Sequence, residues 1–499
     1  NFLKLSFAYI FKNNIKKHLH YYLIKVECAW QELNSLLRKS IQSKIIVCLS
    51  SLIFRLFQAC RRVAAIYHLA GTQSALFFYS SSIWRTMSNT KSFISVLLLT
   101  SLSVFGATSA FAASCPIKIG GLAPLSAPGA VGGGEAMRDA MLIAQDDINA
   151  RGGVLGCDVK VVIADTEGLP EKAAAMMQKL ITQDRVVGVG GGYHSSVGVA
   201  GKDVANAREV PVVFAETWND TITGDKQKFI FRIAPLSSWA SSTIWKHGLE
   251  VPGIKKAAIL TENTDYGIPA AAETTKGLNS GGVEVVTFSV DIGTQDYSGI
   301  VQRIKAEKPG LIIVLATGEA GYNFAQQAAD AGIGPMDIPF HAGQVALESK
   351  AYWENVPDGN LAFVQRIGVP ENLFTAEGKQ FAKVYKAKTG KGDVESYAME
   401  AYDSIAIIAQ AINEAGSTDG NAIVNALENI SHDGTLGRIY FPYGTKKDPS
   451  VDGKGDEWWH QWPDVALTVI QYQKEGESSG NSPIVFPDAY KTGEPIYVK

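Results

Sequence analysis

The sequence predicts an α/β protein built from two doubly wound lobes. Three observations lead to this prediction. Near-continuous apolar runs of strand length alternate with segments whose apolar residues recur at helical spacing. The alternation restarts in the middle of the chain, and helical and strand-like segments return late in it. Because continuous apolar strands must be covered on both faces, we expect parallel sheets. The late return indicates that the chain passes between the lobes more than once.

The expected elements of the first half follow one another as strand and helix. The strands are Ile117–Gly121, Val159–Ala164, Val186–Val189 and Val210–Phe214, and the helices are Ala136–Ala150, Pro170–Gln183 and Val197–Arg208. Proline is favoured in the first turn of a helix, which suits the start at Pro170. The helix Ala136–Ala150 is followed by Gly152 and Gly153, a typical stop signal.

The second half repeats the pattern before it changes. The expected strands are Phe229–Ile233, Lys256–Leu260, Val283–Phe288, Leu311–Ala316, Leu361–Val364, Gly437–Tyr443 and Val465–Gln473. The expected helices are Ser237–Leu249, Tyr266–Asn279, Tyr297–Ala306, Ala320–Ala331, Glu377–Lys388, Ser396–Ala415 and Gly420–Asn429. Three helices in succession after residue 364 therefore interrupt the alternation and precede a late strand.

Residues 1–86 differ from the rest of the chain. They carry 12 of the 46 Lys and Arg residues but only Glu27 and Glu32 as acids, and they hold three of the five cysteines. We interpret them as upstream or unprocessed sequence outside the fold. A basic membrane anchor is the alternative, although the apolar run Ile45–Phe57 is shorter than a membrane span and contains Arg55.

Residues 87–112 have the features of a secretory signal peptide. A short basic start, Met87–Lys91, precedes the apolar run Phe93–Phe105 and the small-residue cleavage site Ala110–Ala112. The exported chain is expected to begin near Ala113, to be soluble and to reside in the periplasm. Its 33 basic and 47 acidic residues give a net charge of about −14, which argues against a nucleic-acid partner.

Two cysteines, Cys115 and Cys157, remain in the exported chain. Each stands just before an expected strand. If these strands are parallel neighbours, both cysteines lie at the same end of the sheet and can form a disulfide in an oxidising compartment. Two buried free thiols are the alternative.

The stretch Val186–Ser196 predicts an anion-binding turn. An apolar strand is expected to end at the glycines Gly190–Gly192, and Ser195 and Ser196 then precede a helix. Glycines let the backbone approach a ligand closely, and the first N–H groups of a helix attract anions. A serine at this point can cap the helix and also hold a carboxylate. An ordinary helix cap without a ligand is the alternative.

Short segments in a specific order identify a family resemblance. They are Ile117–Gly120, Ala123–Ser126, Asp147–Gly156, Lys179–Ile181, Ser195–Ser196, Val210–Pro211, Asp265–Gly267, Asp296–Ser298 and Met399–Ser404. From about Cys115 to about Gln473 the chain resembles the periplasmic binding proteins of the leucine/isoleucine/valine-binding type, the solute receptors of ABC importers. The resemblance implies the type I fold, with two lobes, three crossovers and a ligand cleft between the lobes.

Combined with the pattern above, the resemblance implies a division of the exported chain. The first lobe is expected to comprise 113–236 and 365–444, and the second 237–364 and 445–499, the last with the C-terminal tail.

The resemblance also implies ligand-binding residues. The expected set is Ser195, Ser196, Glu216, Trp218, Tyr266, Thr317 and Tyr397. Ser195 matches a serine that holds the ligand carboxylate in the family. Tyr266 and Tyr397 match aromatic residues of the second lobe and the hinge region, and Thr317 falls where the family has a tyrosine. Most of these positions follow strands, where open α/β sheets bind ligands.

The sequence departs from the family at two ligand contacts. An aromatic residue over the ligand is expected near Gly132, which lies in a run of three glycines. The acid that pairs with the ligand ammonium should fall near His341–Gln344, where no acid occurs. Glu216 or Glu319 is expected to substitute, because a buried ammonium needs a charged partner.

The expected function is that of an exported receptor that traps a small carboxylate-bearing solute, such as an amino acid, for a membrane permease. We expect a monomer without cofactor or metal. A short amide, urea or an aromatic carboxylate is the alternative solute, and a sensing lobe of a signalling system is the alternative role. An enzyme is not expected, because the Gly188–Gly192 segment lacks the third glycine of a dinucleotide motif and Ser195 lacks a nucleophile-elbow motif.

Overall fold

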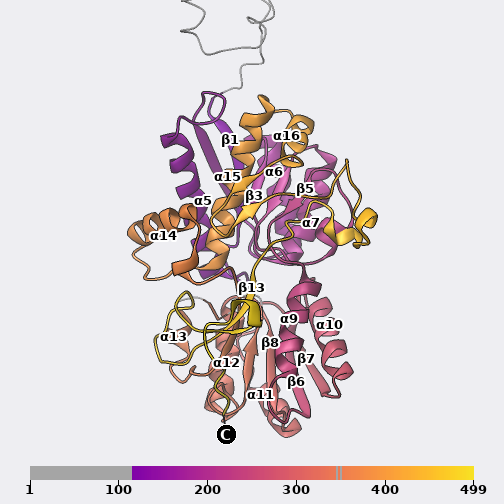
Figure 1. Cartoon of the computed structure of the whole chain (residues 1–499), viewed down its shortest axis with the longest axis vertical. Coiled ribbons are helices and arrows are strands. Elements are labelled where there is room, and N and C mark those ends of the chain that lie inside the picture. The colour runs from indigo at the N-terminus through magenta and orange to yellow at the C-terminus, as the bar shows by residue number, and fades with distance from the viewer. Residues whose placement is uncertain (1–114, 344–346, 349–350, 499) are drawn as a thin grey trace, which may run out of the picture. The chain divides into compact units, whose positions relative to one another are not determined.

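The computed structural model describes residues 115–343, 347–348 and 351–498, so the predicted leader and signal peptide lie outside the described residues. The described chain forms two main β-sheets, each covered by helices (Figure 1). No helix in this part of the chain has the length and apolar character needed to cross a membrane.

The first sheet has five parallel strands in the order β2-β1-β3-β4-β5. They are β1 (Ile117–Ala123), β2 (Val159–Asp165), β3 (Val189–Gly191), β4 (Val212–Phe214) and β5 (Ile230–Arg232). The helices between them are α5 (Val131–Ala150), α6 (Pro170–Lys179), α7 (Ser195–Ala207) and α8 (Thr221–Gly224). Apolar side chains on the two faces of this sheet belong to separate core clusters, as expected for a sheet buried on both sides.

In this lobe one local prediction is wrong, and one predicted helix changes its type near its end. The glycines were expected to end the third strand, but Gly190 and Gly191 lie inside β3. A Cβ atom on Gly190 would stand 2.6 Å from Ser404 Oγ, so the glycine permits a helix to pack directly on the strand. The predicted helix from Pro170 ends as an α-helix at Lys179 and continues as a π-helical turn, Leu180–Asp184.

The second sheet has seven strands in the order β14-β13-β10-β9-β8-β6-β7. The parallel strands are β6 (Lys256–Glu262), β7 (Glu284–Val290), β8 (Leu311–Leu315), β9 (Phe340–Ala342) and β10 (Phe363–Ile367). Next to β10, the strand β13 (Leu467–Gln471) is antiparallel to both β10 and β14 (Ile484–Phe486). The helices are α9 (Ser237–Leu249), α10 (Gly267–Ser280), α11 (Ser298–Glu307), α12 (Glu319–Asp330) and α13 (Ala351–Asn355).

Three late helices return to the first sheet. They are α14 (Ala376–Thr389), α15 (Ser396–Ala415) and α16 (Gly420–Leu427), and α15 packs on α5, β3 and α16. A two-stranded ribbon, β11 (His432–Asp433) and β12 (Arg438–Ile439), follows. The chain therefore passes between the sheets after β5, after β10 and before β13, which confirms the predicted fold of two doubly wound lobes joined by three crossovers.

Residues beyond the ribbon stay beside the first sheet before the last crossover. The N–H of Arg232 in β5 donates to the carbonyl of His460, and the N–H of Trp462 donates to the carbonyl of Arg232. Short 3₁₀ turns occur at Glu371–Leu373, Pro449–Asp452, Asp456–Trp458 and Asp488–Tyr490. The predicted strand Gly437–Tyr443 is therefore reduced to the short strand β12.

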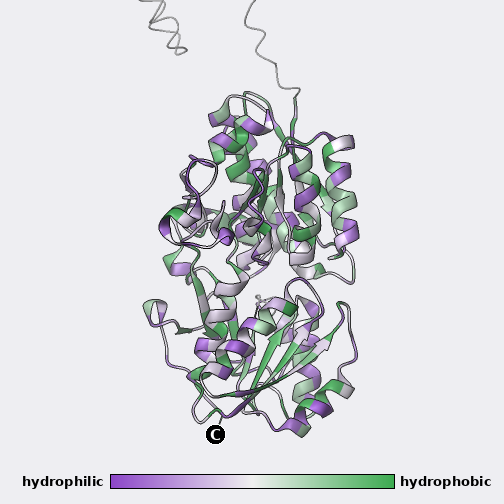
Figure 2. Cartoon of the chain, turned by 90° about the vertical axis from the view of Figure 1, so that its right-hand side faces the viewer, coloured by the Kyte–Doolittle hydropathy of each residue, from purple (hydrophilic) through white to green (hydrophobic). Residues whose placement is uncertain are grey.

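Hydropathy agrees with this layered arrangement. Figure 2 shows hydrophobic colouring along the strands of both sheets and mixed colouring along the covering helices. The apolar strands lie in the core, and covering helices such as α6 and α11 turn one face to the sheet and one to water, whereas α15 is buried on most sides.

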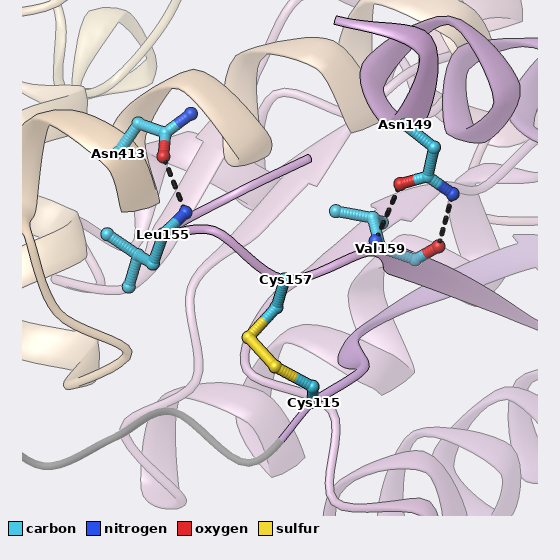
Figure 3. Close-up of a disulfide and its surroundings, with 6 residues drawn as sticks. All are labelled: Cys115, Asn149, Leu155, Cys157, Val159 and Asn413. Atoms are coloured by element: carbon cyan, nitrogen blue, oxygen red, sulfur yellow. Dashed lines mark hydrogen bonds between the residues drawn. A yellow bond between two sulfur atoms is a disulfide. The ribbon is translucent and has the colours of Figure 1, made fainter. Parts of the chain in front are cut away.

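The predicted disulfide between Cys115 and Cys157 is confirmed (Figure 3). Strands β1 and β2 are parallel neighbours, and the cysteines precede them at the same edge of the sheet. Hydrogen bonds also fix the segment that follows Cys157, because Asn149 exchanges hydrogen bonds of 2.7 and 3.0 Å with the backbone of Val159. The disulfide therefore lies at the edge where strands begin, opposite the edge where they end.

Two buried histidines face each other in the second lobe. The Nδ1 atoms of His247 on α9 and His341 on β9 lie 3.4 Å apart. Phe363 and Phe486 surround the His247 ring, at centroid distances of 4.6 and 5.8 Å. Burial lowers the pKa of His247 to about 4, and burial together with His247 lowers the pKa of His341 well below its usual value. Both rings are therefore neutral in the folded protein near pH 7.

The histidine pair predicts a loss of stability in mild acid. The unfolded imidazole takes up a proton near pH 6.5 and the folded one does not, so stability falls as the pH falls through this window. His247 alone is expected to reduce the free energy of unfolding by about 2 kcal/mol between pH 7 and pH 5. Denaturant titrations at several pH values measure the slope of the free energy of unfolding against pH. His247→Phe, which suits the aromatic surroundings, should flatten it, and an unchanged slope would contradict the prediction.

Candidate ligand-binding site

Ser195 is the first residue of α7, next to the end of β4. Its side chain is buried, and its Oγ accepts hydrogen bonds from the backbone N–H groups of Trp218 (3.2 Å) and Asn219 (3.1 Å). The expected cap is wrong, because His194 precedes the helix and Ser195 makes no capping hydrogen bond. A serine hydroxyl has two acceptor positions and one donor. Both acceptor positions are occupied here, so the hydroxyl is left to donate its proton.

Ser196, the other predicted serine, faces the second lobe. Its Oγ accepts from the backbone N–H of Asp265 at 3.3 Å. The side chain of Asn219 donates to the carbonyl of Asp265 at 2.6 Å. On another element, the N–H of Gly132 donates to Glu319 Oε1 at 2.8 Å. The segments that follow the first-lobe strands are therefore in direct contact with the starts of the second-lobe helices α10 and α12.

Glu216 lies just beyond β4, and its N–H extends the ladder by donating to the carbonyl of Gly192 at 2.8 Å. Its carboxyl group is fully buried, and the carboxyl group of Glu400 on α15 and the Trp218 side chain both influence its pKa. Burial raises the pKa of Glu216 to about 8. Burial and the neighbouring Glu216 raise the pKa of Glu400 well above its usual value.

Aromatic rings come from both lobes. The Trp218 ring meets the Tyr266 ring edge to face, with centroids 6.2 Å apart, and the Tyr266 side chain is buried. Tyr397 on α15 meets Tyr193 in a similar way at 5.5 Å. Edge-to-face contact is a favourable arrangement of aromatic rings. The predicted residues Trp218, Tyr266 and Tyr397 therefore lie in two aromatic pairs.

The glycine run that replaces the expected aromatic residue forms the first turn of α5, where a loop was expected. A Cβ atom on Gly133 would stand 2.7 Å from Tyr193 Cε2. Glycine is required there because the tyrosine ring lies against the helix backbone. Tyr193 therefore brings an aromatic side chain to this helix from the end of β3.

Thr317 follows β8 and is bound to Glu262 at the end of β6. Its N–H and Oγ1 donate to Glu262 Oε1 at 2.8 and 2.9 Å. Burial raises the pKa of Glu262 to about 7, and the hydrogen bonds from Thr317 oppose this rise. Because the Thr317 hydroxyl proton is used in this way, only its acceptor positions remain for another partner.

The structure thus brings Ser195, Trp218 and Tyr266 together by direct contacts, whereas Thr317 is joined to Glu262. Three buried residues of this region were not predicted, namely Tyr193, Glu262 and Glu400. A signal for Glu400 was present, because an acid in the apolar run of the helix Ser396–Ala415 is unusual. Tyr193 belongs to the glycine and serine stretch that predicted the site.

A buried ion pair joins the second crossover to α15. Arg366 Nε in β10 donates to Glu348 Oε1 at 3.0 Å, and Glu348 accepts from both the N–H (2.8 Å) and the Oγ (2.6 Å) of Ser396 at the start of α15. The guanidinium group also donates to the carbonyl groups of Val394 and Ser479. Burial raises the pKa of Glu348, and the charge of Arg366 opposes this rise.

Among the described residues, no group of three or more His, Cys, Asp and Glu side chains is placed to hold a metal ion. The region instead combines a hydroxyl donor at the start of a helix, aromatic rings and buried carboxyl groups. Such a set can bind a small polar molecule.

Comparisons with known proteins identify the family. The sequence profile of the periplasmic binding proteins matches residues 116–449. The Leu/Ile/Val-binding protein homolog 7 of Brucella abortus is 26% identical over 373 residues, covering 72% of this chain and 92% of the relative. A leucine-, isoleucine-, valine-, threonine- and alanine-binding protein of Pseudomonas aeruginosa is 27% identical over 385 residues, covering 76% and 95%.

Solved structures share the fold. The branched-chain amino acid transporter substrate-binding protein LivJ from Streptococcus pneumoniae, in complex with isoleucine, superposes with a TM-score of 0.64 at 22% identity, covering 74% of this chain and 99% of that one. A solute-binding protein of an ABC transporter from R. palustris, in complex with benzoate, has a TM-score of 0.63 at 20% identity, covering 75% and 98%.

Proposed function

Because this chain belongs to the periplasmic binding protein family, we propose that it traps a small carboxylate-bearing solute, an amino acid or a related compound, between its lobes. The exported protein would then deliver this solute to the permease of an ABC importer. It acts in the periplasm as a monomeric receptor and catalyses no reaction. The proposed ligand contacts are Ser195, Ser196, Glu216, Trp218, Tyr266, Thr317 and Tyr397.

The hydrogen bonding of Ser195 carries this proposal. Its acceptor positions are occupied by the N–H groups of Trp218 and Asn219, so its hydroxyl is suited to donate to an acceptor. It stands at the start of α7, where helix N–H groups and the helix dipole favour a negative group. A carboxylate satisfies both features.

The relatives support the same class of solute. The Pseudomonas aeruginosa relative is named for binding leucine, isoleucine, valine, threonine and alanine, and the two solved structures hold isoleucine and benzoate; all of these molecules carry a carboxylate. The common group is the one that Ser195 is suited to hold. The remainder of the solute would lie among the aromatic rings.

Ser195→Ala tests this role. Removal of the donor should weaken the binding of a carboxylate ligand by about 1.5–3 kcal/mol, or roughly 10- to 150-fold in Kd, the range for hydrogen bonds to charged groups. Calorimetric titration with leucine, benzoate and a short amide measures the affinity. The variant also leaves two backbone N–H groups unsatisfied, so the melting temperature should fall as well.

Ser404→Ala is the matched control. Ser404 is equally buried, and its Oγ accepts from the N–H of Gly191 at 3.0 Å on the side of β3 that faces α15. This substitution should lower the melting temperature and leave the ligand affinity unchanged. Equal loss of affinity in both variants, or none in Ser195→Ala, would exclude Ser195 as the carboxylate contact.

A further inference from the structure

We infer that Arg232 supplies the positive charge that favours a carboxylate at Ser195, and that it acts through a backbone peptide group between the two side chains. This role rests on the proposed function and deepens it, because it adds a residue that sets the preference for an anionic group over a neutral one. Arg232 is the last residue of β5 and was not among the predicted site residues. It is a positioning residue, because its effect reaches the solute through Ser195.

The Arg232 side chain is a buried cation whose hydrogen-bond acceptors are all neutral. Its exposed fraction is 0%. The Nε atom donates to Gln461 Oε1 at 2.7 Å, Nη2 donates to Thr223 Oγ1 at 3.0 Å, and Nη1 donates to two backbone carbonyl groups. Among the described residues no acid forms an ion pair with Arg232, and the charges of Asp220 and Glu457 act on it without a hydrogen bond.

Arg232 nevertheless keeps its charge at pH 7. Burial lowers its pKa to about 10, because low-dielectric surroundings penalise the charged form, and the group is still protonated at neutral pH. Buried charges are normally paired with an opposite charge. Arg366, which is also buried, shows this usual arrangement, since its Nε donates to the Glu348 carboxylate. The unpaired cation of β5 therefore favours an anion in its neighbourhood.

Two backbone carbonyl groups connect Arg232 with Ser195. Nη1 donates to the carbonyl oxygens of Thr217 at 3.3 Å and Asn219 at 2.6 Å. The Thr217 carbonyl and the Trp218 N–H belong to one peptide group, and this N–H donates to Ser195 Oγ at 3.2 Å. A cation at the oxygen of a peptide group polarises its N–H, because hydrogen bonds in a chain strengthen one another. The Ser195 hydroxyl therefore becomes a better donor to an anion.

The same contacts fix the segment 217–219. The carbonyl groups of residues 217 and 219 bind Arg232, and the Trp218 carbonyl accepts from the N–H of Ser237 at 2.7 Å. The N–H groups of residues 218 and 219 are held on the other side by Ser195. Arg232 thus orients both N–H groups and polarises one of them.

Gln461 holds another side of the guanidinium group. Its Nε2 donates to the carbonyl groups of Ala234, just after β5, at 2.7 Å and of Trp462, in the segment before β13, at 2.8 Å. The amide oxygen is thereby directed at Arg232 Nε and brings no charge to compensate the cation. A carboxylate in place of this amide would neutralise Arg232 where it stands.

The preference for a carboxylate over its amide tests this role. Calorimetric titrations with benzoate and benzamide, and with leucine and leucinamide, give the ratio of the two Kd values within each pair. Arg232→Met should reduce the preference about tenfold, the magnitude expected for a unit charge that three hydrogen bonds and a peptide group separate from the carboxylate. Arg232→Lys keeps the charge but loses the planar fork, and it should keep most of the preference. Equal weakening of acid and amide in both variants would overturn the inference.

Gln461→Glu tests the charge while Arg232 stays in place. The new carboxylate compensates the guanidinium group, so the preference should fall as it does in Arg232→Met. This measurement decides the question even if Arg232→Met does not fold. An unchanged preference in Gln461→Glu would overturn the inference.

Lys202→Met is the matched control. Lys202 lies in α7, and its buried Nζ donates to the carbonyl of Thr221 at 2.7 Å and is paired with Asp225. It is thus a buried cation near the same site that already has an acid partner. The substitution should lower the melting temperature and leave the preference unchanged. A loss of preference as large as that in Gln461→Glu would contradict a specific role of Arg232.

The same titrations separate this role from the proposed function. If Ser195→Ala loses the preference and the variants of Arg232 and Gln461 keep it, Ser195 holds the carboxylate and the role of Arg232 is wrong. If the wild-type protein binds the amides as tightly as the acids, or binds neither, the carboxylate receptor and the role of Arg232 are both wrong.

Discussion

Replacing Cys115 and Cys157 by serine is expected to lower the free energy of unfolding by about 4 kcal/mol, the loop-entropy estimate for cysteines 42 residues apart. The disulfide closes a loop that contains β1, α5 and the turn into β2. The unfolded chain gains conformational freedom when the loop is opened, whereas the folded lobe keeps its strand pairing. Denaturant titration of the oxidised protein and of the double variant measures the difference.

Ligand binding should be almost unaffected by this double variant. The cysteines precede β1 and β2, whereas Ser195 and Glu216 follow β3 and β4 at the opposite edge of the same parallel sheet. Wild-type protein unfolded with a reductant is the control, and its unfolding curve should match that of the variant. Equal stability of the oxidised protein and the variant, or a large loss of affinity, would contradict this account.

The sequence was sufficient to predict the two lobes and the order of their elements, because the strands are buried on both faces. Runs such as Leu311–Leu315 are apolar throughout, and the helices between them have clear periodicity. The missed elements are short. β9 and β14 have three residues each and take their strand conformation from neighbouring strands. Local sequence carries little signal for such elements.

The site was predicted where its residues are adjacent in sequence to strand ends. Ser195, Trp218 and Tyr266 have this property, and the structure places them in contact. The electrostatic influence of Glu216 on Glu400 joins positions from different parts of the chain, so periodicity and motif reading could not predict it. The same holds for the bond between Thr317 and Glu262.

Buried charged groups show most clearly which contacts cannot be predicted from the sequence alone. Glu348 and Arg366 read as ordinary surface residues in the sequence, yet their side chains are 0% and 3% exposed in the ion pair. Their partners come from α15 and from the C-terminal segment, so the pair joins the second crossover to both. Charged groups tolerate such burial only when they are paired and hydrogen-bonded.

Arg366→Met is therefore expected to lower the free energy of unfolding by about 3–5 kcal/mol, because it leaves the Glu348 carboxylate buried without its cation. The penalty should shrink as the pH falls from 7 towards 5. Burial already raises the pKa of Glu348, and loss of Arg366 raises it further, so the folded variant takes up a proton before the unfolded chain does. Denaturant titrations at both pH values measure the two effects.

Two further variants isolate the buried pair. Adding Glu348→Gln to Arg366→Met removes the unpaired charge and should restore part of the lost stability at pH 7. Lys386→Met breaks an ion pair with Glu371 whose side chains are 28% and 31% exposed, and it should cost less than about 1 kcal/mol because water screens that pair. A loss in Arg366→Met no larger than that in Lys386→Met would show that the crossover does not depend on the buried charge pair.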